Sequence, residues 1–170
     1  VQCLVGSEMC IRDRLIIMSP KWILRHKLAT SSLEELAEGG FESVIDDSIK
    51  NKKKVVKIIL CSGKVYYHLL EARDEKKIKN IAIIRIEQLY PFPDIEMDNI
   101  LKKYSYVESI IWCQEEPRNQ GAWYNSQHFL RAAVGRLSED LSLDYCGRAS
   151  SAAPASGYMS VHLEEQRRFI

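Results

Sequence analysis

The fold of this chain is decided by the stretch Cys113-Gln114-Glu115-Glu116-Pro117-Arg118-Asn119-Gln120-Gly121-Ala122-Trp123-Tyr124, which directly follows the apolar segment Ser109-Ile110-Ile111-Trp112. The apolar segment predicts a buried strand, and Pro117 predicts its end, because proline has no N–H to donate to a strand ladder. Asn119 is a good helix N-cap, so a helix is expected from Gln120. A polar cluster between the end of a strand and the start of a helix is where open α/β sheets place binding sites.

The rest of the chain alternates strand and helix patterns. Short apolar runs predict buried parallel strands at 55–61, 81–86, 107–113 and, more weakly, 141–146. Helical spacing and capping residues predict helices at 64–77, from Asp94 to Tyr104, at 120–137 and from Val161 onward. Strands that alternate with helices of this length form right-handed βαβ units. We therefore expect an α/β fold with a mostly parallel, doubly wound sheet and helices on both faces.

Weaker signals precede these elements. Residues 15–18 predict a strand, and Pro20 predicts a short helical turn. Ser32 and Glu35 have the spacing of a capping box, which predicts a further helix start. The basic run 52–54 follows two aspartates and is expected to be a solvated connector.

Polar side chains follow each predicted strand. Because the carboxyl ends of parallel strands share one edge of a sheet, we expect these side chains to converge there. The residues are Lys64, Arg85, Glu87, Gln88, Glu115, Glu116, Asn119, Gln120 and Arg148. Arg85 is expected to pair with Glu115 or Glu116, and Tyr90 and Trp123 are expected to flank the edge as exposed aromatic residues. Such an edge binds a ligand or docks a neighbouring domain, and the pattern does not separate these two interpretations.

Composition excludes several kinds of partner. The chain has 170 residues, enough for a sizeable core, and a formal net charge of +1 from 24 basic and 23 acidic side chains. That balance gives no electrostatic case for binding nucleic acid. Without an apolar run long enough to cross a bilayer, no membrane partner is expected either.

The usual signatures of catalysis and metal binding are also missing. The five cysteines form no Cys-x-x-Cys, and the four histidines supply no metal-ligand spacing. Cys61, Cys113 and Cys146 end apolar runs and are expected to be small buried thiols. Glu115 and Glu116 are adjacent on an extended segment, so they should point to opposite sides and cannot easily flank one bond. We therefore expect no catalytic, cofactor-binding or metal-binding residue.

Five stretches of the chain together resemble the C-terminal domain of the thiamine-diphosphate-dependent, decarboxylating component of 2-oxoglutarate dehydrogenase. The similarity extends from Leu15 to about Arg168, in the family's order and approximate spacing. The stretches are the run 113–124; Arg85-Ile86-Glu87-Gln88-Leu89-Tyr90-Pro91-Phe92-Pro93; Cys61-Ser62-Gly63-Lys64-Val65-Tyr66-Tyr67; Met18-Ser19-Pro20-Lys21 with Leu24-Arg25-His26-Lys27; and Ser151-Ala152-Ala153-Pro154 with Gly157-Tyr158-Met159-Ser160-Val161-His162.

The resemblance implies a fold like the C-terminal domain of transketolase. For the whole enzyme, it implies oxidative decarboxylation of 2-oxoglutarate in the tricarboxylic acid cycle, with thiamine diphosphate and magnesium. The succinyl unit then passes to a lipoyl group of the acyltransferase component. The family's Gly-Asp-Gly and Asn-Asn cofactor motifs do not occur in this chain. The chain is thus expected to bind no cofactor and to be inactive alone. The resemblance implies that it braces the upstream domains and the homodimer. In some relatives this region also takes part in binding a regulatory effector, which makes the convergent edge a candidate for such binding.

The two ends of the chain show a foreign segment and signs of truncation. Residues 1–14 resemble translated sequencing-adapter DNA and are expected to be a foreign tail, which leaves 15–170 as the domain. This domain begins within a strand pattern and stops within a helical one, so truncation at both ends is expected. The run 157–160 resembles bacterial members, which favours the cytoplasm over the alternative, the mitochondrial matrix. A free-standing α/β module that binds a nucleotide or acyl-CoA is the alternative function.

Overall fold

The computed structural model describes residues 19–170, which fall into two units divided between Ser31 and Ser32. In the first unit, the N–H of Ile23 donates to the carbonyl of Pro20 at 3.1 Å and begins the short 3₁₀ helix η3 (Ile23–Arg25). The predicted helical turn at Pro20 is therefore confirmed. The predictions for the tail 1–14 and for a strand at 15–18 lie outside the described residues.

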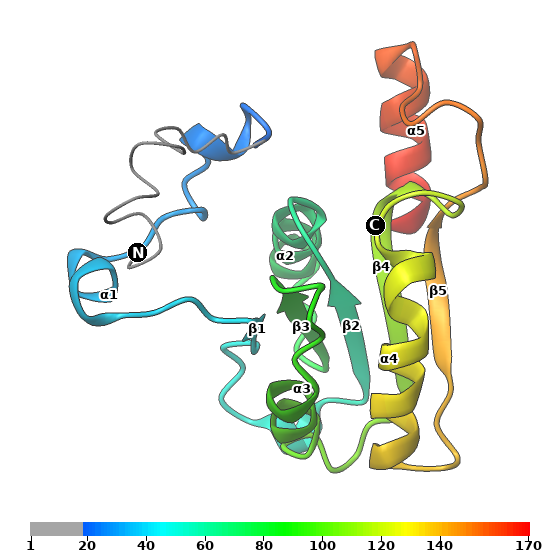
Figure 1. Ribbon diagram of the computed structural model, residues 1–170. Coiled ribbons are helices and arrows are strands. Elements are labelled where there is room, and N and C mark those ends of the chain that lie inside the picture. The colour runs from blue at the N-terminus through cyan, green and yellow to red at the C-terminus, as the bar shows by residue number, and fades with distance from the viewer. Residues whose placement is uncertain (1–18) are drawn as a thin grey trace, which may run out of the picture. The chain divides into compact units, whose positions relative to one another are not determined.

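The second unit contains a five-stranded sheet and its helices (Figure 1). The strand order is β1-β3-β2-β4-β5, with every neighbouring pair parallel except β1 and β3. The α/β, mostly parallel fold is thus confirmed. Its elements are α1 (Leu33–Glu38), β1 (Val44–Ile45), η4 (Lys52–Lys54), β2 (Lys57–Cys61), α2 (Val65–Glu75), β3 (Ile81–Ile86), α3 (Asp94–Leu101), β4 (Ser109–Pro117), α4 (Trp123–Leu137), β5 (Leu143–Arg148) and α5 (Met159–Phe169).

Side chains of the central strands alternate between two apolar cores, as a sheet covered on both faces requires. On one face, Leu60 and Trp112 pack with residues of α3 and α4. On the other face, Cys61 and Cys113 pack with α2 and with the end of α5. Helices therefore cover both faces, which is the doubly wound arrangement.

Some predicted boundaries are wrong. Strand β4 does not stop at Cys113 but extends to Pro117, where the proline ends it. A bulge between Gln114 and Pro117 shifts the ladder, and the N–H of Arg118 donates to the carbonyl of Arg148 at 3.1 Å. Asp94 does not cap α3, since Pro93 occupies the N-cap and Asp94 is the first helical residue. The capping box of Ser32 and Glu35 is confirmed at α1.

The buried carboxylate of Asp47 completes the β1 edge of the sheet. Strand β1 is only two residues long, so it leaves edge N–H groups of β3 without a strand partner. Asp47 is 7% exposed and accepts hydrogen bonds from the N–H of Ile83 at 2.7 Å and of Ile49 at 3.1 Å. It also forms an ion pair with Arg73. One carboxylate therefore joins the β1–η4 connection, β3 and α2.

Asp46 points to a different group of side chains. It accepts hydrogen bonds from Tyr104 at 2.6 Å, Lys52 at 2.5 Å and Lys103 at 3.0 Å. Lys52 is therefore half-buried and paired, which corrects the prediction of a solvated connector, although Lys53 and Lys54 are exposed. Burial alone would raise the pKa of Asp46, but these three hydrogen bonds outweigh it and hold the pKa below its ordinary value of 3.8.

Replacing Asp47 by alanine should lower the free energy of unfolding by about 3–5 kcal/mol, because it leaves Arg73 buried without its charge partner. Asp74→Ala is the matched control. Asp74 also lies near Arg73, at 3.7 Å, but its side chain is 71% exposed, so its loss should cost roughly 0.5 kcal/mol or less. Urea unfolding measures both variants, and equal losses would contradict the role given to Asp47.

The lowered pKa of Asp46 predicts acid sensitivity. Because the unfolded chain binds this proton more readily than the folded chain, the stabilisation is present above pH 3.8 and is lost as the pH falls through the lower folded-state pKa. In urea unfolding between pH 5 and pH 2, roughly the range in which such carboxylates titrate, Asp46→Asn should show a shallower decline in stability than the parent chain. Parallel declines would show that Asp46 contributes no pH dependence.

Candidate functional site

The side chain of Gln114 organises the turn between β4 and α4. It is 2% exposed. Its Oε1 accepts from Trp112 Nε1 and from the N–H of Trp123, both at 3.0 Å. Its Nε2 lies 2.8 Å from the carbonyl of Gln120 and 3.2 Å from that of Pro117, and donates to both. The amide thus satisfies backbone groups on both sides of the turn.

These contacts correct the predicted start of α4. The helix begins at Trp123 rather than Gln120, and Asn119 is not its N-cap. The first helical N–H is satisfied by Gln114, a residue nine positions earlier, which no local capping pattern could indicate. Gly121 allows the turn to close. It has a positive φ of 66°, and an added Cβ would lie 3.0 Å from Cβ of Glu116.

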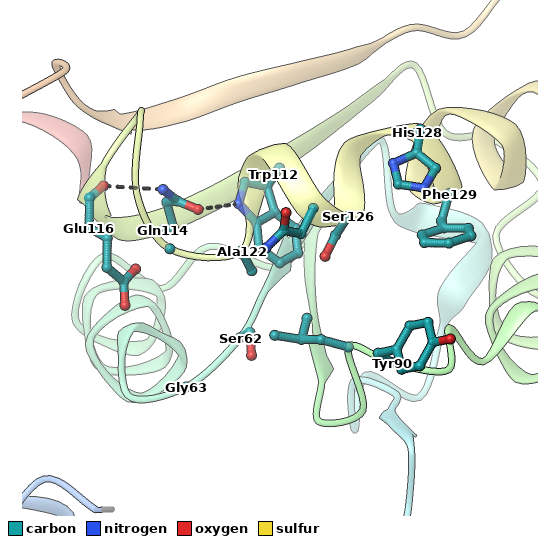
Figure 2. A pocket seen from close by; sticks show the side chains of 13 residues that line it. Ser62, Gly63, Tyr90, Trp112, Gln114, Glu116, Ala122, Ser126, His128 and Phe129 are labelled. Atoms are coloured by element: carbon teal, nitrogen blue, oxygen red, sulfur yellow. Dashed lines mark hydrogen bonds between the residues drawn. The ribbon is translucent and has the colours of Figure 1, made fainter.

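An open pocket of about 720 Å³ lies beside this turn, at the carboxyl edge of the sheet (Figure 2). Trp112 and Phe129 supply aromatic surface, and Tyr90 lies across from Phe129. Polar groups come from Glu116 and from α4. The complete lining is Ser62, Gly63, Leu89, Tyr90, Trp112, Gln114, Glu116, Gly121, Ala122, Asn125, Ser126, His128 and Phe129. Apolar walls with a few polar groups are typical of small-molecule sites and of pockets that receive a partner's side chain.

The two adjacent glutamates point in different directions, as predicted. Glu115 forms an ion pair with Lys64 of the β2–α2 turn at 3.0 Å. Glu116 is exposed and lines the pocket. Of the nine candidate residues, Glu116 alone belongs to the pocket lining. The carboxylates therefore do not form a pair that could act on one bond.

Arg85 does not pair with either of these glutamates. Its Nε lies 2.7 Å from the carboxylate of Glu87, two residues further along the chain. Its guanidinium donates to the hydroxyl of Tyr67 at 2.9 Å and lies over the ring of Tyr66, 4.7 Å from the centroid. Arg85 and Glu87 are neighbours on the same side of an extended chain, so the nearer carboxylate outcompetes those of β4. The charged pair across neighbouring strand ends is instead Lys64 with Glu115.

Three other candidates hold the segment between β5 and α5. The side-chain amide of Asn119 both donates to and accepts from the backbone of Ser151, at 2.9 and 3.0 Å. Gln120 donates to the same carbonyl at 3.1 Å. Arg148 lies 2.8 Å from Nδ1 of His162 and 3.5 Å from Glu165, both on α5. Gln88, the remaining candidate, donates to the carbonyl of Pro91 at 2.7 Å.

Sequence reasoning missed most of the pocket. The expected aromatic flank was half right, because Tyr90 is 84% exposed but Trp123 is buried under the turn. Asn125, His128 and Phe129 line the pocket from α4 at i, i+3 and i+4 spacing and so share one helical face, a signal that was available in the sequence. The role of Gln114 had no such signal, since it depends on the bulge that follows it.

The described residues do not fit a thiamine diphosphate site. The magnesium ion that accompanies a bound diphosphate takes carboxylate and carbonyl oxygens as its protein ligands. Within residues 19–170, no three His, Cys, Asp or Glu residues group in a way that could hold a metal ion. The same described part of the chain contains no helix long and apolar enough to cross a membrane.

The fold and this edge define a doubly wound α/β domain with a pocket at the carboxyl ends of its strands. Residues 30–170 match the family model described as 2-oxoglutarate dehydrogenase C-terminal, so the chain belongs to that family. It is 49% identical over 162 residues to the 2-oxoglutarate dehydrogenase E1 component of Azotobacter vinelandii and 52% identical over 162 residues to the oxoglutarate dehydrogenase of Buchnera aphidicola. Each match covers 94% of this chain, which spans only 17% of the length of either relative.

Gln114→Ala should destabilise the domain by roughly 2–4 kcal/mol, because it strands the buried donors of Trp112 and Trp123, at about 1–3 kcal/mol for each. Gln120→Ala is the matched control, since it removes an amide that is only partly buried and should cost roughly 0.5 kcal/mol or less. Urea unfolding followed by tryptophan fluorescence measures both variants. Similar costs for the two would contradict the central place of Gln114.

Proposed function

We propose that this chain is the C-terminal domain of an enzyme that oxidatively decarboxylates 2-oxoglutarate in the tricarboxylic acid cycle. The support is the family match over 30–170 and the identity of the similar proteins as 2-oxoglutarate dehydrogenase E1 components. In the complete enzyme, thiamine diphosphate with magnesium supplies the carbanion chemistry, and the succinyl unit passes to a lipoyl group on the acyltransferase component. These groups would bind outside this domain.

The role of the domain itself is structural. We propose that the carboxyl edge of the sheet docks upstream domains of the same polypeptide and contributes to a homodimer. Two observations support this role: apolar side chains are exposed at this edge, and the edge carries two ion pairs. The exposed side chains are Leu89, Tyr90, Ile95 and Tyr124, and the ion pairs are Lys64 with Glu115 and Arg85 with Glu87. Exposed apolar patches rimmed by charge are typical of protein interfaces.

The pocket gives this edge a second proposed role, as the place where a regulatory effector binds. Its volume of about 720 Å³ falls within the range of small-molecule sites. The candidate residues that tie β5 to α5, Asn119, Gln120 and Arg148, would hold the far side of that edge in place.

The remaining proposals concern extent and location. We propose that the domain covers 15–170 and that 1–14 is foreign to it. The relatives named above are bacterial, which favours the cytoplasm over the mitochondrial matrix. Their names favour the dehydrogenase over the alternative of a free-standing module for a nucleotide or acyl-CoA.

The activity is tested on the complete polypeptide that contains this chain. With thiamine diphosphate and magnesium, it should release carbon dioxide from 2-oxoglutarate in preference to pyruvate. The 170-residue chain alone should show neither turnover nor thiamine diphosphate binding in calorimetric titration, because it lacks the binding motifs. A complete polypeptide that ignores 2-oxoglutarate would overturn the proposed reaction, and micromolar binding by the isolated chain would overturn the placement of the cofactor.

The docking role predicts a specific weakening of the dimer. In the complete polypeptide, Tyr90→Ser should raise the dimer dissociation constant about tenfold or more, since exposed aromatic residues commonly carry interface energy. Tyr106→Ser is the control, because Tyr106 is 64% exposed but precedes β4, at the opposite edge of the sheet. Analytical ultracentrifugation measures the dimer dissociation constant of both variants. Single-turnover decarboxylation checks that the active sites of the assembled dimer still perform the chemical step. Equal effects of the two variants would contradict docking at the carboxyl edge.

A further inference from the structure

Three cysteines lie side by side on the neighbouring strands β2, β4 and β5. In the parallel register, Cys61 of β2 is the partner of Cys113 of β4, which is in turn the partner of Cys146 of β5. Partners in a parallel ladder point to the same face, here the face covered by α2 and α5. The prediction of buried thiols is confirmed for Cys61 and Cys113, but Cys146 is only partly buried. This unequal burial gives the three thiols different acidities.

Cys61 is enclosed in the core, and its thiol donates to the carbonyl of Ile84 at 3.8 Å. Burial raises its pKa to about 12, so it stays protonated. Cys146 lies nearer solvent, where its thiol donates to the carbonyl of Phe169 at the end of α5 at 3.7 Å. A hydrogen bond with the thiol of Cys113 lowers the pKa of Cys146, against the opposing effect of burial. The same hydrogen bond raises the pKa of Cys113, and burial is the second cause of that rise.

The strand geometry allows these two sulfurs to join. Neighbouring strands lie about 4.8 Å apart, which falls within the Cα separation of roughly 4.4–6.8 Å found in disulfides. The Cβ atoms of a disulfide are closer than the ladder spacing, about 3.8 Å apart, so the strands must draw together slightly. The β4–β5 ladder is already irregular from Gln114, the residue after Cys113, and can adjust there. A bond closed under such strain is readily reduced.

We propose that Cys113 and Cys146 form a reversible oxidation site for hydrogen peroxide, with Cys146 as the attacking sulfur. The Cys146 thiolate attacks one peroxide oxygen, the O–O bond breaks, and the leaving hydroxide takes a proton to become water. The resulting sulfenic acid is attacked by the sulfur of Cys113, which loses its proton as the S–S bond forms and a second water leaves. Two thiols lose two electrons in total, and one peroxide gains them. A dithiol reverses the change by exchange.

The test uses the full 170-residue chain with Cys3 and Cys10 replaced by serine. After treatment with hydrogen peroxide and trypsin, mass spectrometry without reductant should find the peptides 104–118 and 137–148 joined by a disulfide. Alkylation of Cys146 by iodoacetamide at pH 7 should fall about tenfold or more and return after dithiothreitol treatment, as thiolate-controlled chemistry requires.

Variants identify the role of each sulfur. Cys113→Ser should abolish the cross-link and leave a sulfenic acid on Cys146 that dimedone traps. Cys61→Ser, the matched control on the neighbouring strand, should leave the cross-link unchanged. A disulfide between Cys61 and Cys113, or a Cys146 that remains reduced under peroxide that fully oxidises an unstructured cysteine peptide, would overturn the proposal.

Discussion

The constraint on which the carboxyl edge depends is the burial of one primary amide. A buried amide must find partners for both its oxygen and its nitrogen, or it destabilises the fold. Gln114 does so by linking an indole on its own strand, the first N–H of the next helix and the carbonyls of the intervening turn. The direction in which α4 leaves the sheet is thereby fixed. The pocket, which is bounded by that helix and that turn, takes its shape from the same set of hydrogen bonds.

The sheet could be predicted from the sequence because its strands are nearly uniform in chemistry. The run 81–86 is apolar except for Arg85, and β3 has those bounds. Such a run has no stable place except between two covering layers, so the parallel sheet and the helices on both faces follow from it. Patterns that depend only on residues close together in the sequence also predicted the structure correctly, as the capping box of Ser32 and Glu35 shows.

The candidate site could be predicted only in part, because its details depend on competition between partners. Convergence at the carboxyl edge followed from topology, but the pairing of Arg85 did not, since a carboxylate two residues away reaches it before those on β4. Likewise, a proline that ends a regular strand is tolerated after a bulge, and Asn119 binds Ser151 rather than capping a helix. Sequence patterns report what a residue can do locally, whereas bulges and long-range partners decide which of those options is taken.

The shortness of β1 has a consequence for behaviour in a crowded solution. An edge strand with free N–H groups is a template on which another chain can add a strand and begin to aggregate. At this edge, the N–H of Ile83 is taken by the side chain of Asp47 rather than by a backbone carbonyl. A carboxylate cannot be extended by a further strand, and an incoming backbone would have to displace a buried, ion-paired group. The sheet is thereby protected on this side against growth by strand addition.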